Sequence, residues 1–182
     1  MARPKKFDEI TVKNALRDVF WERGYDGATY SHIMEATGLK KGSLYASFGD
    51  KNSLYGIALR HYNETDGHEA IRILSDDRLT IGVKLNALFG SVLSTVGTPK
   101  ALWGCFICNA AVDPAIVDDE NKSIIQASVL QMLEAIHRAL PESKKHKAEH
   151  IQAVYFGSRA LVKAGADHDR VCNICDSLLA DI

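Results

Sequence analysis

Two Cys-x-x-Cys pairs, Cys105/Cys108 and Cys172/Cys175, are the residues whose spacing most directly suggests chemistry. Zinc sites and redox dithiols both use this spacing, so a thiol-based redox or metal-binding protein is one hypothesis. Structural zinc pairs normally sit on turns, whereas both pairs here lie within apolar segments with helical spacing. With 63 residues between the pairs, nothing forces them together. We interpret them as core cysteines and predict no metal site.

Other catalytic signatures are missing from the sequence. The seven histidines are scattered, and no His-Glu-x-x-His pattern, nucleophile elbow, P-loop or dinucleotide-binding glycine fingerprint occurs. His168, four residues before Cys172, is more simply an exposed residue near a helix start. The sequence therefore predicts no catalytic residue and no cofactor.

Residues 29–48 predict two short helices joined by a glycine turn, which is a helix-turn-helix pattern. Gly38 stands where a helix commonly ends in the left-handed conformation. The apolar seam between the helices is formed by Ile33, Ala36, Leu39, Leu44 and Phe48. The face left over offers small residues, hydroxyls and lysines, the types that read base edges and hold phosphates. A helical hairpin with a solvated lysine face remains the alternative.

A wider set of residues resembles the N-terminal domain of the tetracycline-repressor (TetR) family of bacterial transcription regulators. It comprises Gly24-Tyr25, Thr29, Ile33, Ala36, Gly38, Lys41 to Tyr45, Phe48, Lys51 and Leu54. The resemblance implies a homodimeric repressor that places residues 41–48 in the major groove of operator DNA. It also implies that a small-molecule effector binds the C-terminal helices and releases the protein from DNA.

The DNA-contacting residues expected from the pattern and the resemblance are Thr29, Tyr30, Ser31, Lys40, Lys41, Gly42, Ser43, Tyr45, Ala46 and Lys51. We assign Thr29, Tyr45 and Lys51 to phosphates, and Ser43 and Lys41 to positioning or base edges. Several positions depart from the family's usual residues: Ser31 replaces arginine, Met34 alanine and Gly49 proline, while Ala46 and Ser47 replace bulky side chains. Base preference is therefore open.

The segment around Cys105 resembles a TetR subgroup that includes repressors responding to reactive electrophiles. The resemblance rests on Gly104, Cys105, Phe106 and Asn109. A sensor cysteine needs thiolate character and solvent access, and Lys100 or Arg78 could supply a neighbouring positive charge. We keep both hypotheses for Cys105, a sensor or a core residue. The predicted effector-site residues are Phe89, Trp103, Cys105 and Phe106.

Composition and periodicity predict an all-α fold. The chain has 182 residues, 46% hydrophobic and 25% charged, with four prolines and no convincing strand alternation. We predict a three-helix DNA-binding domain at 1–52, with a first helix ending at Gly24, and a helical effector-binding and dimerisation domain at 53–182. The nearly uncharged segment 103–112 is expected to be buried on all sides.

Charge is distributed unevenly along the chain. Residues 1–60 hold ten Lys/Arg against seven Asp/Glu, whereas residues 61–182 hold twelve against sixteen. Basic residues thus concentrate on the part expected to face phosphates. Arg3, Lys5 and Lys6 could form a DNA-contacting arm. No signal peptide or membrane-length apolar run is visible, which predicts a cytoplasmic protein that does not contact a membrane.

The last two predicted helices carry faces that need partners. Small residues recur at Ala153, Gly157, Ala160 and Ala164, and the final helix carries Ile174 and Leu178. A stripe of small residues lets another helix approach closely. In the family resembled, the last two helices of each subunit form a four-helix dimer interface, so we expect these six residues there. The alternative is that the stripe fills the subunit's own core.

Overall fold

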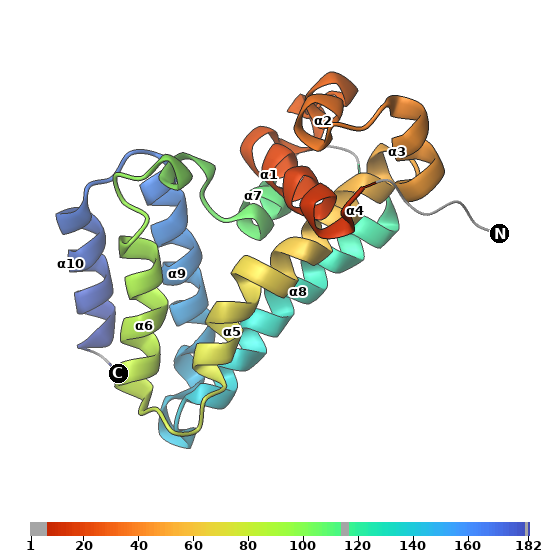
Figure 1. The fold of residues 1–182 in the computed structure, drawn as a ribbon. Helices are drawn as coiled ribbons and strands as arrows, with labels where there is room; N and C mark the ends of the chain where they lie inside the picture. Colours follow the sequence, from red (N-terminus) through yellow and green to blue (C-terminus); the bar gives the residue numbers. More distant parts are fainter. Residues whose placement is uncertain (1–6, 114–116, 181) are drawn as a thin grey trace.

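The computed structural model describes residues 7–113, 117–180 and 182, and within them it is built of helices and connecting turns (Figure 1). The all-α fold class predicted from the sequence is confirmed. The α-helices are α1 (Glu9–Gly27), α2 (Tyr30–Thr37), α3 (Lys41–Phe48), α4 (Lys51–Tyr62), α5 (His68–Leu74), α6 (Ile81–Leu93), α7 (Phe106–Val112), α8 (Asp119–Ala139), α9 (Ala148–Lys163) and α10 (His168–Leu179). The predicted basic arm lies outside the described residues.

Helix α1 begins at a strong cap and continues past the residue where it was expected to end. The Asp8 carboxylate accepts hydrogen bonds from the backbone N–H groups of Ile10 and Thr11. Gly24 has the left-handed φ of 69°, as a C-terminal glycine would, but helical bonding resumes to Gly27. The expected stop at Gly24 is thus a kink inside the helix, at a position that glycine adopts without steric cost.

Helices α2 and α3 form the predicted helix-turn-helix. Thr29 caps α2, because its hydroxyl accepts from the N–H of His32 while the His32 ring accepts from the N–H of Thr29. Gly38 ends α2 with a φ of 67°. Ile33 and Leu44 of the predicted seam are fully buried. Ala36 is exposed, which corrects its placement in the seam.

Helix α4 runs into α5 through a single wide turn, so the two form one continuous rod (Figure 1). Asp50 caps α4 by accepting from the N–H of Ser53, at 2.9 Å. Residues Asn63–Gly67 form a π-helical turn between the two α-helices. Such turns carry an extra residue and occur frequently at functional sites. The chain therefore leaves the helix-turn-helix along a helix, not a loop.

Buried side chains gather in two hydrophobic clusters. The first is formed by α1, α2, α3, α4, α7 and the first half of α8, and it includes Leu16, Phe20, Leu44 and Tyr55. The second joins α5, α6, the second half of α8, α9 and α10. Helix α8 contributes to both clusters, lying beside α4 and α5 along its length (Figure 1).

The segment expected to be buried on all sides is only partly so. Phe106 and Ile107 are buried, but Trp103 is half-buried and the side chain of Val112 is 82% exposed. The segment divides into a 3-10 turn, Pro99–Trp103, and the seven-residue helix α7. Because a short helix packed on one side keeps an outer face, the lack of charge here does not mean complete burial.

Candidate nucleic-acid interface and buried cavity

The outer surface of α2 and α3 carries most of the residues predicted to contact DNA. Thr29, Ser31, Lys40, Lys41, Gly42, Ser43, Tyr45 and Ala46 are exposed, while Tyr30 and Lys51 are half-buried. Leu44, on the opposite side of α3, is fully buried. The helix is therefore held by one face, and its small and hydroxylated residues are presented on the other.

Two tyrosines and a lysine form a compact group on this surface. The rings of Tyr30 and Tyr45 stack with centroids 5.4 Å apart, and their hydroxyl groups are hydrogen-bonded at 2.8 Å. The Lys41 Nζ lies 4.7 Å from the centroid of the Tyr30 ring. Burial, followed by the hydrogen bond to Tyr45, raises the pKa of Tyr30, so the Tyr30 hydroxyl stays protonated at neutral pH. The group offers hydrogen-bond donors and a positive charge.

The lysines of this surface keep their charge available. Lys51 lies over the ring of Tyr25, with its Nζ 4.7 Å from the centroid. Within the described part of the chain, Lys40, Lys41 and Lys51 form no ion pair with a carboxylate. A lysine without a carboxylate partner can neutralise a phosphate without first breaking an ion pair. Thr29 caps α2 through its oxygen, and its hydroxyl hydrogen remains available to a phosphate.

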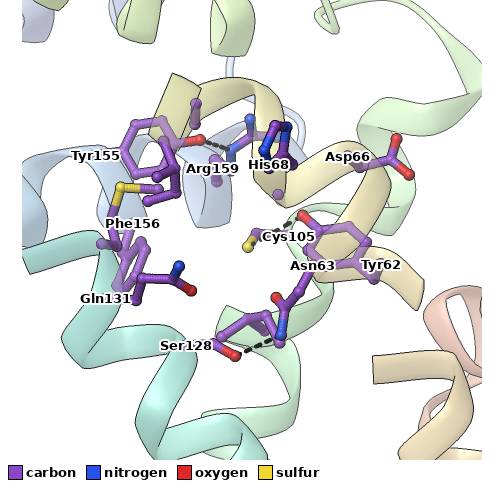
Figure 2. A pocket seen from close by; sticks show the side chains of 15 residues that line it. Tyr62, Asn63, Asp66, His68, Cys105, Ser128, Gln131, Tyr155, Phe156 and Arg159 are labelled. Carbon is purple, nitrogen blue, oxygen red and sulfur yellow. Dashed lines mark hydrogen bonds between the residues drawn. The ribbon is translucent and has the colours of Figure 1, made fainter. Parts of the chain in front are cut away.

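A small cavity lies between the π-turn, α5, α7, α8 and α9 (Figure 2). Its accessible volume is about 70 Å³. The walls are formed by Tyr62, Asn63, Asp66, Gly67, His68, Ala70, Ile71, Cys105, Ile107, Ser128, Gln131, Met132, Tyr155, Phe156 and Arg159. His68 and Gln131 are exposed wall residues, so the cavity reaches the surface beside them.

Cys105 projects into this cavity from the residue just before α7 (Figure 2). Its side chain is 6% exposed. The Tyr62 hydroxyl donates to the Cys105 Sγ at 3.5 Å. The hydrogen bond from the Cys108 thiol is the largest influence that lowers the pKa of Cys105, and the positive charge of Arg159 lowers it further. Burial acts in the opposite direction. These contacts favour the thiolate.

Arg159, on α9, supplies the positive charge of this site. Its Nε donates to the Tyr155 hydroxyl at 3.0 Å, and its Nη2 donates to the Ser91 Oγ at 3.4 Å. The guanidinium carbon lies 5.1 Å from the centroid of the Tyr155 ring. The residues proposed for this role from the sequence lie elsewhere: Arg78 pairs with Asp76, and Lys100 pairs with Asp66.

Three of the four predicted effector-site residues do not line this cavity. Cys105 does, but Phe89 is 1% exposed within the second hydrophobic cluster, among other core side chains. Phe106 packs edge-on against Tyr55 and Tyr62 in the first cluster. Trp103 packs against Trp21 with centroids 5.6 Å apart. These three side chains pack against other core and aromatic side chains, and their part in effector binding stays a prediction.

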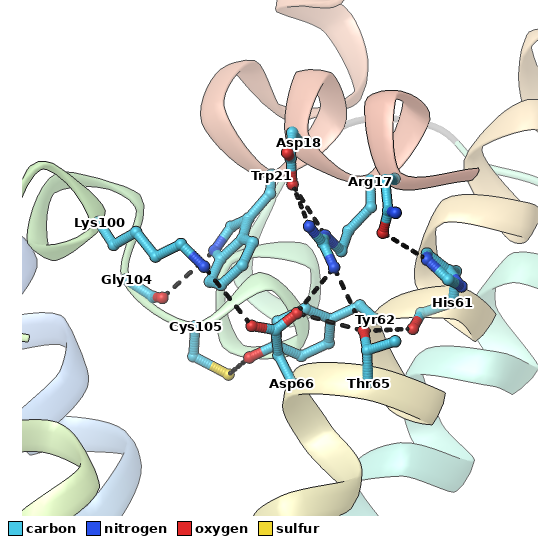
Figure 3. Close-up of polar contacts among 11 residues, drawn as sticks. Arg17, Asp18, Trp21, His61, Tyr62, Thr65, Asp66, Lys100, Gly104 and Cys105 are labelled. Atoms are coloured by element: carbon cyan, nitrogen blue, oxygen red, sulfur yellow. Dashed lines mark hydrogen bonds and ion pairs between the residues drawn. The ribbon is translucent and has the colours of Figure 1, made fainter. Parts of the chain in front are cut away.

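A polar bridge connects the cavity wall to α1 (Figure 3). The Asp66 carboxylate, in the π-turn, forms ion pairs with the Arg17 Nη1 at 3.1 Å and with the Lys100 Nζ at 3.8 Å. The Arg17 Nη2 also lies 2.8 Å from Asp18. Nearby, the Trp21 Nε1 donates to the carbonyl oxygen of Gly104, next to Cys105. Two contacts thus link α1 directly to residues at the cavity.

The second cysteine pair lies apart from the first. Cys175 belongs to the second hydrophobic cluster, and Cys172 is half-buried beside Asp176, with its Sγ 3.5 Å from a carboxylate oxygen. The Asp176 contact raises the pKa of Cys172. Among the described residues, no three His, Cys, Asp or Glu side chains are grouped as metal ligands would be.

The small-residue stripe of α9 faces outward. Ala153, Gly157, Ala160 and Ala164 are exposed, while Ile151, Tyr155 and Val162 of the same helix are buried. Apart from the neighbouring residues and backbone of α9 itself, no atom of the described structure lies within 4 Å of the place where a Cβ at Gly157 would be. The stripe therefore does not fill the core of its own subunit. Of the other two predicted interface residues, Ile174 is half-buried and Leu178 is buried.

Sequence reasoning missed Arg159 and Tyr62 as partners of Cys105. One signal was present: Arg159 follows Tyr155 by four residues, so it lies on the apolar face of a helix where arginine is unusual. The contact of Tyr62 with Cys105 joins residues 43 positions apart. No local pattern encodes such a contact.

Comparison with known proteins identifies the N-terminal helices. The family model for bacterial regulatory proteins of the tetR family matches residues 14–56, which span most of α1 and all of α2 and α3. The repressor ComR of Escherichia coli is 24% identical over 188 residues, covering 97% of this chain and 90% of that protein. Residues 14–56 therefore carry the DNA-binding domain of the TetR family of bacterial transcription regulators.

Solved TetR-family structures share the whole fold. A cysteine variant of CifR, solved with a 26-base-pair operator DNA, has a TM-score of 0.86 and 23% identity over 98% of both chains. The reduced form of Escherichia coli NemR has a TM-score of 0.79 and 14% identity, over 94% of this chain and 96% of that one. None of the described helices is long and apolar enough to cross a membrane.

Proposed function

We propose that this TetR-family regulator is a homodimeric repressor that binds operator DNA through α3 and leaves it when an effector occupies the C-terminal part. The observation that carries the proposal is the Lys41–Tyr30–Tyr45 group on the surface of α2 and α3, with Lys41 and Tyr45 exposed on the helix that corresponds to the family's recognition helix. Hydroxyl and ammonium donors free of carboxylate partners are what phosphate contacts require. The protein acts by binding, without catalysis, in the cytoplasm.

We assign DNA binding to residues 1–52, and binding of the effector and of the second subunit to residues 53–182, as the sequence predicts. Two recognition helices must match two half-sites about one helical turn apart, roughly 34 Å. A change in their separation weakens binding without altering any base contact. The outward stripe on α9, together with α10, provides the surface for the second subunit.

The test is binding of the full-length protein to labelled duplex DNA from the region flanking its own gene, measured by fluorescence anisotropy across a salt series. Lys41→Ala should weaken binding about tenfold and flatten the plot of log affinity against log salt, by about one unit per phosphate contact removed. Tyr45→Phe should weaken it less, because only one donor is lost. Both variants should stay folded, since Lys41 and Tyr45 are exposed.

Lys122→Ala is the matched control, because Lys122 is an exposed lysine on α8 that pairs only with Asp119 among the described residues. It should bind as the wild type does. Wild-type binding that ignores salt, or a Lys41→Ala variant indistinguishable from Lys122→Ala, would remove α3 as the DNA-binding element.

A further inference from the structure

Arg159 brings a positive charge to the cavity, and no carboxylate of the described residues forms an ion pair with it. Its hydrogen-bond partners, Tyr155 and Ser91, are neutral hydroxyl groups. Burial raises the pKa of Tyr155, so this phenol does not become a phenolate near neutral pH. A guanidinium is always charged in proteins. Arg159 is half-buried, and a charge partly removed from water is costly unless it is paired.

Asp66 is the only carboxylate among the described residues of the cavity wall, and it already has cationic partners. Asp66 pairs with Arg17 at 3.1 Å and with Lys100 at 3.8 Å, both outside the set of lining residues. In Figure 2 its carboxylate lies on the side of the cavity opposite Tyr155 and Phe156. On the described wall, the Cys105 thiol is therefore the only acidic group left that could balance the charge of Arg159.

The remaining wall sets the size and character of a ligand. An accessible volume of about 70 Å³ holds roughly five water-sized groups at about 15 Å³ each. Ile71, Met132 and Phe156 give one apolar side, while Gln131 offers an amide near the opening. The Cys105 Sγ lies within the same space (Figure 2).

We propose that this cavity binds a small carboxylate of about five non-hydrogen atoms, with its anionic group on Arg159 and its carbon chain toward the Cys105 Sγ. The inference rests on the proposed function in one respect, namely that this cavity is the effector site. It adds the chemical class of the effector. The rival account is that a Cys105 thiolate is itself the counter-charge of Arg159, in which case an anionic ligand gains nothing.

Two alkylating probes separate these accounts, because iodoacetate and iodoacetamide are of similar size but only iodoacetate is charged. With either, the Cys105 thiolate attacks the CH₂ carbon, a C–S bond forms, and iodide leaves with the electron pair of the C–I bond. The thiol proton has passed to water beforehand. The full-length native protein is treated with each probe, and adducts are followed at each cysteine by peptide mass spectrometry.

At Cys105 we expect the rate ratio of iodoacetate to iodoacetamide to exceed that of free glutathione by about tenfold or more, because a charge-assisted hydrogen bond holds only the anion. The iodoacetate rate should saturate with concentration, and acetate should compete where acetamide does not. Cys172 is an internal reference in the same molecule, since it lies beside Asp176. It should show no preference for the anion.

Arg159→Met should bring the Cys105 ratio down to that of glutathione, and Arg159→Lys should retain part of it. A wild-type ratio equal to that of glutathione, or a ratio unchanged in Arg159→Met, overturns the proposal. If Arg159→Met does not fold, acetate competition in the wild type decides alone. If native Cys105 resists both probes, acetate must raise the wild-type melting temperature and acetamide must not, or the proposal fails.

The outcome is independent of whether the protein binds DNA, because labelling is measured without DNA. A protein that prefers iodoacetate but does not bind duplex would refute the proposed function and leave the anion site standing. A protein that binds duplex DNA but shows no preference for iodoacetate would refute the anion site and leave the proposed function standing.

Discussion

Cys105 differs from the other cysteines in the groups that surround its sulfur. Cys108, Arg159 and Tyr62 all lower the pKa of Cys105. By contrast, burial raises the pKa of Cys175, and Asp176 raises that of Cys172. Since the thiolate is the nucleophile, the structure favours reaction at Cys105 among the four. Its 6% exposure means that a reagent must enter through the cavity.

We predict that an electrophile such as N-ethylmaleimide weakens the binding of the wild-type protein to DNA at least tenfold, because an adduct on Cys105 cannot fit the cavity as it stands. Cys105→Ser should bind DNA normally and lose this response, since serine keeps the shape and removes the thiolate. Anisotropy before and after treatment measures both.

Cys175→Ser is the matched control, because Cys175 is equally buried but lies in the second hydrophobic cluster. It should respond to the electrophile as the wild type does. If Cys105→Ser responds too, or if its main effect is a loss of roughly 1 to 3 kcal/mol of stability, Cys105 is a core residue and not a sensor.

At the scale of elements, α9 has an inner and an outer face with different tasks. The inner face holds Tyr155 and Arg159 against the cavity, while the outer face carries the exposed small residues. The helix that presents the cavity's positive charge is therefore the same helix that would meet the second subunit. A change in how α9 packs would affect both.

We expect Ala160→Lys to convert a dimer into monomers, because a long charged side chain would separate closely packed helices and lose its hydration. Sedimentation at several protein concentrations measures this. Ala36→Lys, at an exposed alanine of α2, should leave the assembly unchanged. A fully dimeric Ala160→Lys protein would show that the small-residue stripe is a free surface.

The elements could be predicted from the sequence because their signals are local. Asp50 and Thr80 are residue types that favour the N-cap position, and in the structure each accepts from the N–H group three residues later. Gly38 ends α2 as expected. Gly24 illustrates the limit, because a left-handed glycine can end a helix or kink it, and tertiary packing decides between these outcomes.

The cavity around Cys105 could be predicted from the sequence only in part. Cys105 was singled out from the sequence, but the cavity around it depends on α4, α7, α8 and α9 meeting in space. The π-turn at Asn63–Gly67 has no sequence signature of its own. Arg159 and Tyr62 become partners of Cys105 only in the folded chain, so neither short-range spacing nor composition could reveal them.

At the scale of the whole molecule, His61 links α4 to α1. It is a buried residue of α4 whose Nε2 lies 2.8 Å from Asn14 Oδ1 on α1. Burial lowers the pKa of His61 below its usual value, and the positive charge of Arg17 lowers it further. The folded state therefore binds the proton less readily than the unfolded chain does.

The sign of the pH dependence follows. Above about pH 6.5, His61 is neutral in both the folded and the unfolded state and does not change the free energy of unfolding. As the pH falls below that value, the unfolded chain binds the proton first. The free energy of unfolding therefore decreases until the pH has passed the pKa of His61 in the folded state. We expect the free energy of unfolding to fall by at most about 1.4 kcal/mol between pH 6.5 and 5.5 from this residue. Urea denaturation at fixed protein concentration measures it.

His61→Gln should remove this part of the pH dependence, because glutamine does not titrate and can still donate to Asn14. The carboxyl groups with lowered pKa, such as Asp76 and Glu69, change charge below about pH 4, outside this window. An unchanged pH profile in His61→Gln would assign the effect to another group.

Because α4 and α5 form one continuous rod, a tilt at the π-turn, which would be its fulcrum, would move the opposite end of α4. The 12 residues of α4 span about 18 Å at 1.5 Å per residue. A tilt of about 5° at the fulcrum would therefore displace the far end, next to α3, by about 1.6 Å. Asn63, Asp66 and Gly67 belong both to the fulcrum and to the cavity wall. A ligand of only a few atoms would thus be able to shift α2 and α3 by about the length of one covalent bond. In a dimer, the displacements of the two DNA-binding domains would add.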